Sequence, residues 1–377
     1  MAGLRRSPRS CTRSCSEVGM DTSNPRKLRN DDPSSVSRRR MLILLGLAGL
    51  LALSILVALF IGTLGPIGPA AQHRISYGDA LKAIFSGSGE WETIFWDVRI
   101  PRVLLAGLVG AALACAGTAM QAVFRNPLAD PFIIGVSSGA ALGAATAGLI
   151  GLTAAVSVFL PPFFAFITAL ATVFAVYALG TVRGKVYADT LLLSGVAVAA
   201  FLGAIVSFLI YFVREQFHQL IFWLLGSLTL ASWDMVLVVF IATVIGSLLI
   251  FLHGRDLNAL LLGDETAHNL GVDPEFLRKL MLGVAALMTA TAVAFTGIIG
   301  FVGLIVPHMM RLVFGADHRI LVPASTLFGG IFLILCDAVA RTVAAPTELP
   351  VGVITALCGG PFFIYLLRRS RLGGEQR

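Results

Sequence analysis

Apolar runs long enough to cross a lipid bilayer recur along this chain from residue 41 to residue 367. A helix of about 20 apolar residues spans the roughly 30 Å hydrocarbon core of a bilayer. Such a helix satisfies its backbone hydrogen bonds internally, as lipid requires. We therefore predict an all-α, polytopic membrane protein with about ten transmembrane helices. The predicted spans cover residues 41–62, 103–124, 133–151, 158–180, 191–212, 233–252, 280–296, 298–313, 321–343 and 350–367.

The composition supports a membrane protein with a polar N-terminal segment. The chain is 57% hydrophobic and 13% charged, whereas a soluble domain carries about 25% charged residues. Residues 1–40 contain ten Lys or Arg and four acidic residues, which gives this segment +6 of the total charge of +7. The segment has almost no apolar run, so we predict a disordered, basic cytoplasmic tail. The remaining chain is nearly neutral, which argues against nucleic-acid binding.

Positive residues near spans are retained in the cytoplasm, and they predict the orientation here. With Arg38, Arg39 and Arg40 inside, alternate loops carry most of the other basic residues, and an even span count places both termini in the cytoplasm. We therefore predict a cell-membrane protein with a ten-span permease domain over 41–368 and a cytoplasmic tail over 369–377. The outer loops also hold basic residues, namely Arg74, Lys82, Arg99, Arg102 and Arg214.

The residues around the first span permit another interpretation. Ser37 to Arg40 before an apolar run resembles a twin-arginine signal, and Pro69-Ala70-Ala71 resembles a cleavage site. Cleavage would leave nine spans and place the termini on opposite sides. Because residues 41–62 are long for a signal core, we favour an uncleaved first span.

The sequence shows no group of residues typical of catalysis, a cofactor or a metal. Gly180 to Val186 resembles a phosphate-binding loop, but its glycine spacing is wrong and Val186 replaces the Ser or Thr that holds magnesium. The histidines and cysteines are scattered without metal-ligand spacing. We therefore predict that the chain is not an enzyme and holds no cofactor.

Ionisable residues within the predicted spans are few and peripheral. An ion-coupled carrier needs acidic groups near mid-membrane. The sequence offers none that is convincing, which argues against that class and leaves it as the alternative. Asp337 and Arg341 lie four residues apart on one helix face, which fits an internal ion pair or an outward docking charge. Arg99 and Arg102 precede the second span, and their chemistry alone fits snorkelling to lipid headgroups.

Several ordered motifs resemble the permease family of ABC importers for iron-siderophores, haem and cobalamin, and the matches cover essentially all of 41–368. They include Arg99-Ile100-Pro101-Arg102, and a core of Arg125, Asn126, Pro127, Leu128, Ala129, Asp130 and Pro131. Further family-motif residues are Gly135, Ser137, Ser138, Gly139, Pro307 and His308. Residues 1–40 have no counterpart in this pattern.

The resemblance implies a homodimer with a translocation path along its two-fold axis. It also implies a cytoplasmic ABC ATPase dimer below and an extracytoplasmic substrate-binding protein above. In such permeases outer arginines pair with acidic residues of the binding protein, and Arg99, Arg102 and Arg341 occupy the matching positions. A guanidinium group suits this role because it can donate two parallel hydrogen bonds to a carboxylate.

The inner loop over 253–281 is predicted to contain two short helices separated by glycine, which would form a docking surface for another protein. Its segment from Glu265 to Gly271 resembles the Glu-Ala-Ala-x-x-x-Gly motif of importer permeases, with Thr266 in place of the first Ala. The resemblance makes this loop the ATPase coupling element, with the residues Gly263, Asp264, Glu265, Thr266, Ala267 and Gly271.

The resemblance predicts the transmembrane permease subunit of an ABC importer for a bulky metal chelate. An iron(III)-siderophore is the favoured substrate, with haem and cobalamin as alternatives within the class. An ion-coupled carrier working without an ATPase is the alternative class.

Overall fold

The structure is almost entirely helical. It is a computed structural model that describes residues 33–61, 92–151, 159–182, 185–212 and 217–374. The chain forms two compact units, residues 1–42 and residues 43–377. The described part of the first unit is the beginning of α1, residues 33–42. The other described helices belong to the second unit.

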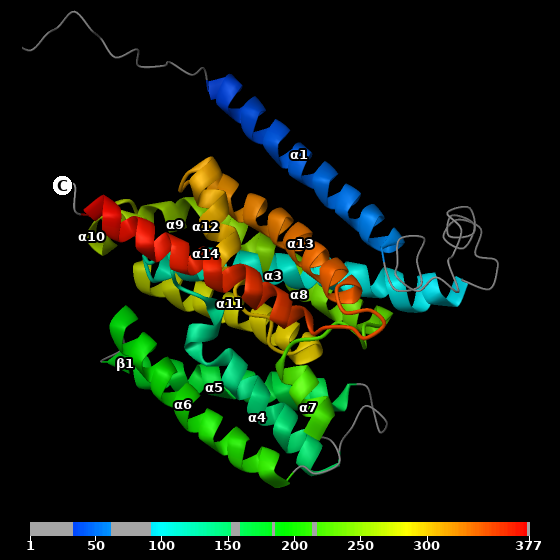
Figure 1. Ribbon diagram of the computed structural model, residues 1–377. Coiled ribbons are helices and arrows are strands. Elements are labelled where there is room, and N and C mark those ends of the chain that lie inside the picture. Colours follow the sequence, from blue (N-terminus) through cyan, green and yellow to red (C-terminus); the bar gives the residue numbers. More distant parts are fainter. Residues whose placement is uncertain (1–32, 62–91, 152–158, 183–184, 213–216, 375–377) are drawn as a thin grey trace, which may run out of the picture. The chain divides into compact units, whose positions relative to one another are not determined.

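Each of the ten predicted spans coincides with one helix (Figure 1). These helices are α1 (Pro33–Phe60), α3 (Ile100–Val123), α4 (Val136–Leu149), α5 (Leu160–Gly180), α6 (Ala188–Phe212), α8 (Trp233–Leu252), α11 (Pro274–Thr296), α12 (Val302–Phe314), α13 (His318–Thr342) and α14 (Val351–Gly374). Shorter elements are η1 (Ile94–Arg99), η2 (Pro131–Ile134), α7 (Phe217–Leu224), α9 (Gly254–Leu261) and α10 (Asp264–Asn269).

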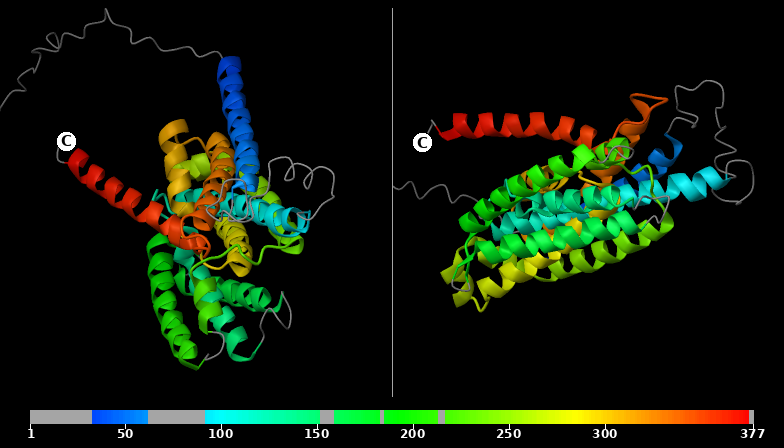
Figure 2. Two further views of the ribbon diagram at one scale, coloured as in Figure 1. Left: turned by 45° about the vertical axis from the view of Figure 1, so that its right-hand side comes forward. Right: turned by 90° about the horizontal axis from the view of Figure 1, so that it is seen from below.

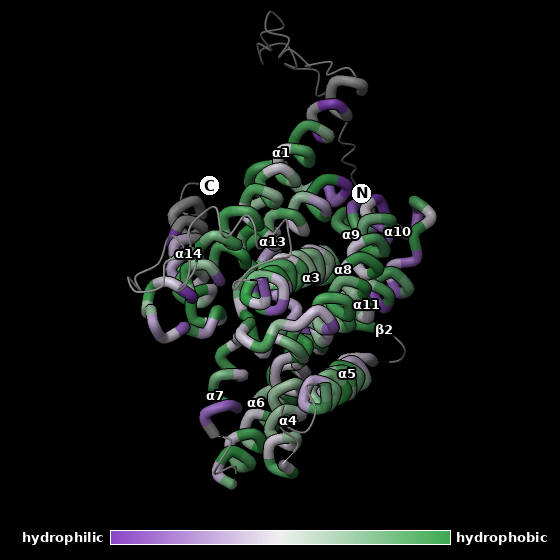
Figure 3. Tube along the Cα trace, turned by 90° about the vertical axis from the view of Figure 1, so that its right-hand side faces the viewer, coloured by the Kyte–Doolittle hydropathy of each residue, from purple (hydrophilic) through white to green (hydrophobic). Residues whose placement is uncertain are grey.

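Seven helices of the described chain are long and apolar enough to cross a membrane. They are α1, α5, α6, α8, α11, α13 and the continuous η1–α3 segment. Helices α4 and α12 and the apolar part of α14, Val351–Tyr365, are shorter. The predicted all-helical, polytopic membrane architecture is confirmed. Figure 3 shows the hydropathy along these helices, with hydrophilic residues prominent at α9 and α10.

The N-terminal segment differs in part from its predicted disorder. Helix α1 begins at Pro33, so residues 33–40 are helical. Proline is favoured at the first position of a helix. A helix that an apolar run has nucleated also extends at one hydrogen bond per added residue. The rest of the predicted tail, residues 1–32, lies outside the described residues. At the other end, α14 continues through most of the predicted tail to Gly374.

Helix α3 forms the centre of the unit, packing against α8, α11, α12 and α13. In the η1–α3 segment 78% of the most apolar stretch is buried, compared with 11% in α6. Small residues permit this packing. A Cβ added at Gly110 of α3 would lie 2.8 Å from the carbonyl carbon of Gly329 in α13, which is closer than real Cβ contacts allow. The two backbones therefore approach as small-residue motifs permit in membranes.

Helices α4, α5 and α6 pack together and join the remainder through contacts of α4 and α5 with α11. Figures 1 and 3 both show this group on the side of α11 that lies away from α13. The right-hand view of Figure 2 shows the green, cyan and yellow helices running alongside one another. This arrangement leaves much of α6 uncovered by its own chain.

A small antiparallel hairpin joins α5 to α6. Strand β1 (Thr181–Val182) pairs with β2 (Lys185–Val186), with Thr181 opposite Val186. The segment that resembles a phosphate-binding loop therefore contributes the two paired strands of this hairpin. A phosphate loop instead connects a strand to a helix.

Candidate functional site

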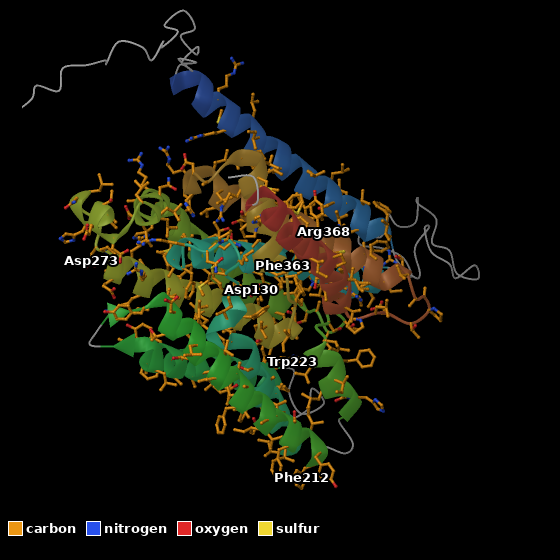
Figure 4. All side chains as sticks on the ribbon, turned by 60° about the vertical axis from the view of Figure 1, so that its left-hand side comes forward. Asp130, Phe212, Trp223, Asp273, Phe363 and Arg368 are labelled. Carbon is orange, nitrogen blue, oxygen red and sulfur yellow. The ribbon has the colours of Figure 1, made fainter. Side chains whose placement is uncertain are left out.

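The inner loop folds as the predicted pair of short helices, α9 and α10. Gly263 separates them with a φ of +117°, and Gly271 follows α10 with a φ of +84°. Residues with a side chain rarely adopt such angles, so glycine is required at both junctions. Asp273 then caps α11 by accepting hydrogen bonds from the backbone N–H groups of Glu275 and Phe276. Figure 4 shows Asp273 at one end of the helices and Phe212, which ends α6, far from it.

Asp264 joins the loop to the end of α3, which is distant in the chain, and to α11, the helix that follows the loop. Its Oδ1 accepts a hydrogen bond from Arg125, at the end of α3, and another of 2.6 Å from Arg278 of α11. Arg125 also donates through Nε to the carbonyl oxygen of Leu260 at 2.8 Å. Burial opposes ionisation of Asp264, but the bonds and charges of Arg278 and Arg125 outweigh it and lower its pKa. The carboxylate is therefore charged at neutral pH.

Asn258 fixes α9 to the start of α13. Its amide nitrogen donates to Asp317 at 2.8 Å, and its amide oxygen accepts from the His318 backbone N–H at 2.9 Å. Burial raises the pKa of Asp317, but hydrogen bonds from Arg319 and Asn258 more than offset it, so the pKa lies well below the usual range. The loop is thus held by α3, α11 and α13. Sequence analysis missed Asn258 and Arg278, since nothing local in the sequence indicates their long-range partners.

A cavity of about 550 Å³ lies beside the loop. Its walls come from the end of α3, the start of α6, α10 and the start of α11. The polar lining residues are Arg125, Tyr187, Asp264, Glu265, His268, Glu275 and Arg278. The predicted motif residue Glu265 is exposed, whereas Ala267 is fully buried. The loop therefore presents one charged face outward and anchors itself by the other.

The predicted docking arginines form a second cluster. Arg99 ends η1, Arg102 lies in the first turn of α3, and Arg341 lies near the end of α13. Arg102 donates to Asp337 at 3.0 Å and to Glu348 at 2.7 Å. The predicted ion pair between Asp337 and Arg341 is present, with Nε and Oδ2 3.0 Å apart. Asp337 is therefore shared by two guanidinium groups. Together with Arg99, the cluster contains three arginines and two acids, Asp337 and Glu348. Its formal charge is therefore +1.

Two of these arginines also hold the end of α1. Arg99 donates to the Leu59 carbonyl oxygen at 2.8 Å, and Arg341 donates to the carbonyl oxygens of Ala58 and Ile61 at 3.2 and 3.1 Å. The last carbonyl groups of a helix lack partners within the helix, so these bonds satisfy them. Arg99, Arg102 and Arg341 are only 6%, 6% and 4% exposed. They do not snorkel to a surface in this chain.

The elbow, residues 125–134, joins α3 to α4 and is stabilised by its own side chains. Asn126 accepts from the Leu128 backbone N–H at 2.9 Å, and Asp130 accepts from that of Phe132 at 2.8 Å. Burial raises the pKa of Asp130 to about 6, although the bond from Phe132 opposes this. Asp130, labelled in Figure 4, is half-buried. The two prolines, Pro127 and Pro131, restrict the backbone on either side.

The other motif residues lie at helix starts and crossings. Gly135 has a φ of +83° before α4, and Ser138 donates to its carbonyl oxygen at 3.0 Å. Ser137 and Gly139 lie in the first turns of α4. Pro307 is inside α12, and the ring of His308 lies 6.2 Å from that of Phe362 in α14. Within the described chain, no group of His, Cys, Asp and Glu could hold a metal.

Comparison with known proteins identifies this arrangement. The model of the FecCD transport family matches residues 50–369. The chain belongs to the FecCD transport family. It is 50% identical over 277 residues to the cobalamin import system permease protein BtuC of Halobacterium salinarum, covering 74% of each chain. It is 43% identical over 293 residues to the hemin transport system permease protein HmuU of Yersinia pestis, covering 75% of this chain and 85% of the relative.

The fold agrees with this family. A chain solved in an inward-facing conformation, and assigned to the metal-chelate type of ABC transporter, matches with a TM-score of 0.74 and 32% identity. The match covers 87% of this chain and 99% of that one. This FecCD protein is therefore a multi-pass membrane permease of an ABC importer for metal chelates. It is not itself the ATPase, and it works with an ATPase and a binding protein.

Proposed function

We propose that this chain forms a homodimeric, ten-span conduit with both termini in the cytoplasm, driven by an ATPase that docks on the α9–α10 loop. The single observation that carries the proposal is the anchoring of that loop. Arg125, Arg278 and Asn258 tie it to three different helices. A loop that only connected two spans would need no such anchoring. A loop that receives force from a partner must be rigidly joined to the helices it moves.

Much of the surface of α6 is not covered by its own chain, so it is available to a second subunit. Its outward face carries exposed Leu193, Val196, Phe201 and Phe208. Such a face suits lipid or a second apolar helix. In a homodimer, the two copies would enclose the translocation path.

The substrate we propose is a bulky metal chelate. Sequence analysis favours an iron(III)-siderophore, whereas the 50% identity to a cobalamin permease favours cobalamin. Haem is the third candidate, through the 43% identical hemin permease. Uptake into proteoliposomes containing the complete complex, measured separately with each of the three chelates, distinguishes them.

The coupling role is tested by charge reversal at the exposed loop acid, Glu265→Arg. We expect this variant to insert into the membrane but to retain less ATPase in a mild-detergent pull-down, because it reverses a charge on the docking face. Asp234→Arg is the matched control, since Asp234 is an exposed acid in the first turn of α8, at the opposite end of that helix from the loop. Equal ATPase retention by both variants would remove the loop from the docking surface.

The arginine cluster is our proposed contact for the binding protein. Its surplus positive charge can attract an acidic residue of that partner, and a carboxylate accepts a stronger hydrogen bond from guanidinium than a backbone carbonyl does. Docking would therefore draw Arg99 and Arg341 away from the end of α1. Arg99→Gln, which leaves the ion pairs of Asp337 with Arg102 and Arg341 in place, should weaken binding-protein capture and leave ATPase retention intact. Equal loss of both partners would indicate misfolding instead.

A further inference from the structure

We propose that Arg125 transmits movement of the α9–α10 loop to the elbow between α3 and α4, and through the elbow to α6 and α12. The inference rests on the proposed function, because an ATPase must move the loop. It assigns a mechanical role to one residue that sequence analysis treats only as part of a structural motif.

The side chain of Arg125 holds both short helices at once. Its Nε donates to Leu260, whose carbonyl group lies near the end of α9, and its Nη2 donates to Asp264, the first residue of α10. A planar guanidinium group can make both bonds in a fixed relative direction. The junction between the two helices is therefore clamped to the elbow at two points.

The backbone of Arg125 indicates that this side chain is needed. Its φ is +48°, in the left-handed region. A turn with only a structural purpose would use Gly or Asn there, because other residues are strained. Strained backbone persists where surrounding contacts hold it, and it is frequent in switch regions. The contacts of the guanidinium group with the loop supply that restraint.

The far side of the elbow is wedged against two other helices. A Cβ at Gly195 of α6 would lie 3.2 Å from the carbonyl carbon of Ile133, and one at Gly303 of α12 would lie 2.8 Å from Cδ of Pro131. The first contact is between two backbones and the second is between backbone and a rigid proline ring, so no flexible side chain lies between them. Close-packed contacts of this kind pass displacement on instead of absorbing it. Movement of the elbow must therefore shift α6 and α12.

The contacts of Arg125 contribute more to transmission than to folding. The side chains of Arg125 and Asp264 are 36% and 50% exposed, and exposed ion pairs add little stability. Arg125→Gln should therefore fold. Arg278 provides the matched control, because it binds the same Asp264 from α11. Arg278→Gln removes one ion pair of the loop and leaves its connection to the elbow intact.

The experiment measures distances between pairs of spin labels in the complete complex in nanodiscs, with and without trapped nucleotide. One pair joins the elbow to the loop, Pro127→Cys with Leu270→Cys, and a second joins α6 to the loop, Tyr187→Cys with Leu270→Cys. All three positions are exposed. Other reactive cysteines are replaced. In the wild type and in Arg278→Gln we expect both distances to be the same in the two nucleotide states, because loop, elbow and α6 move together.

In Arg125→Gln we expect both distances to change on nucleotide trapping while ATPase retention persists. Arg125→Lys, which keeps the charge but loses the planar fork, should show a smaller change and serves if the Gln variant fails to fold. Unchanged distances in Arg125→Gln and Arg125→Lys, or a nucleotide-dependent change in the wild type, would overturn the inference. So would an Arg278→Gln variant that behaves like Arg125→Gln. Loss of the ATPase from the wild-type complex would instead overturn the proposed function, together with the transmission role.

Discussion

At the scale of single residues, the most demanding site is Asp337, a buried carboxylate shared by Arg102 and Arg341. Removing one member of a buried ionic group leaves an uncompensated charge and typically costs about 3–5 kcal/mol. We expect Asp337→Asn to lower the thermal unfolding temperature of the purified protein strongly. Glu348 binds the same Arg102 but is 31% exposed, so Glu348→Gln should cost about 1 kcal/mol or less. Similar losses in the two variants would contradict this account.

A second residue-scale prediction concerns pH and Asp130. Burial raises the pKa of Asp130 to about 6, so between its ordinary value and about 6 the folded protein binds a proton that the unfolded chain releases. Stability contributed by this group is therefore lost as pH rises through that window. Asn can accept the same hydrogen bond from Phe132 without titrating. We expect Asp130→Asn to be more thermostable than the wild type at pH 7, with the difference shrinking towards pH 4. A difference in unfolding temperature between the two proteins that does not change with pH would refute this prediction.

At the scale of elements, the close approach of α3 and α13 makes a testable contrast between two glycines. An added methyl group at Gly110 meets the backbone of Gly329, whereas one at Gly107 meets the flexible end of Ile334 at 3.3 Å. Overpacking against backbone typically costs about 1–3 kcal/mol. Gly110→Ala should therefore lower the unfolding temperature, and Gly107→Ala should be nearly neutral. The prediction fails if both variants behave alike.

At the scale of the whole molecule, the proposed ten-span topology predicts which side of the membrane each loop faces. The α9–α10 loop and the start of α13 share hydrogen bonds, so they lie on one face. A cysteine at the exposed Leu270 should react with an impermeant maleimide only from the cytoplasmic side of oriented vesicles. A cysteine at exposed Val343, which follows α13, should react only from the opposite side. Labelling of both from one side would contradict the topology.

The sequence by itself determined the order and approximate bounds of the helices, and it located the pair of short helices α9 and α10. Hydropathy, glycine junctions and the Asp273 cap are local signals, so one stretch of chain suffices to identify each. The helical start at Pro33 departed from prediction because a helix propagates beyond the apolar run that favours it.

Only the tertiary structure decided which charged groups meet. Arg125 reaches Asp264 across 139 residues, and Arg102 reaches Asp337 across 235. Nothing in the local sequence distinguishes these partners from other arginines and acids, because pairing depends on how helices distant in the chain pack. The three outer arginines illustrate the difference. The sequence predicted docking or snorkelling charges at Arg99 and Arg102, and an ion pair or a docking charge at Arg341. The folded chain buries all three against Asp337, Glu348 and the end of α1.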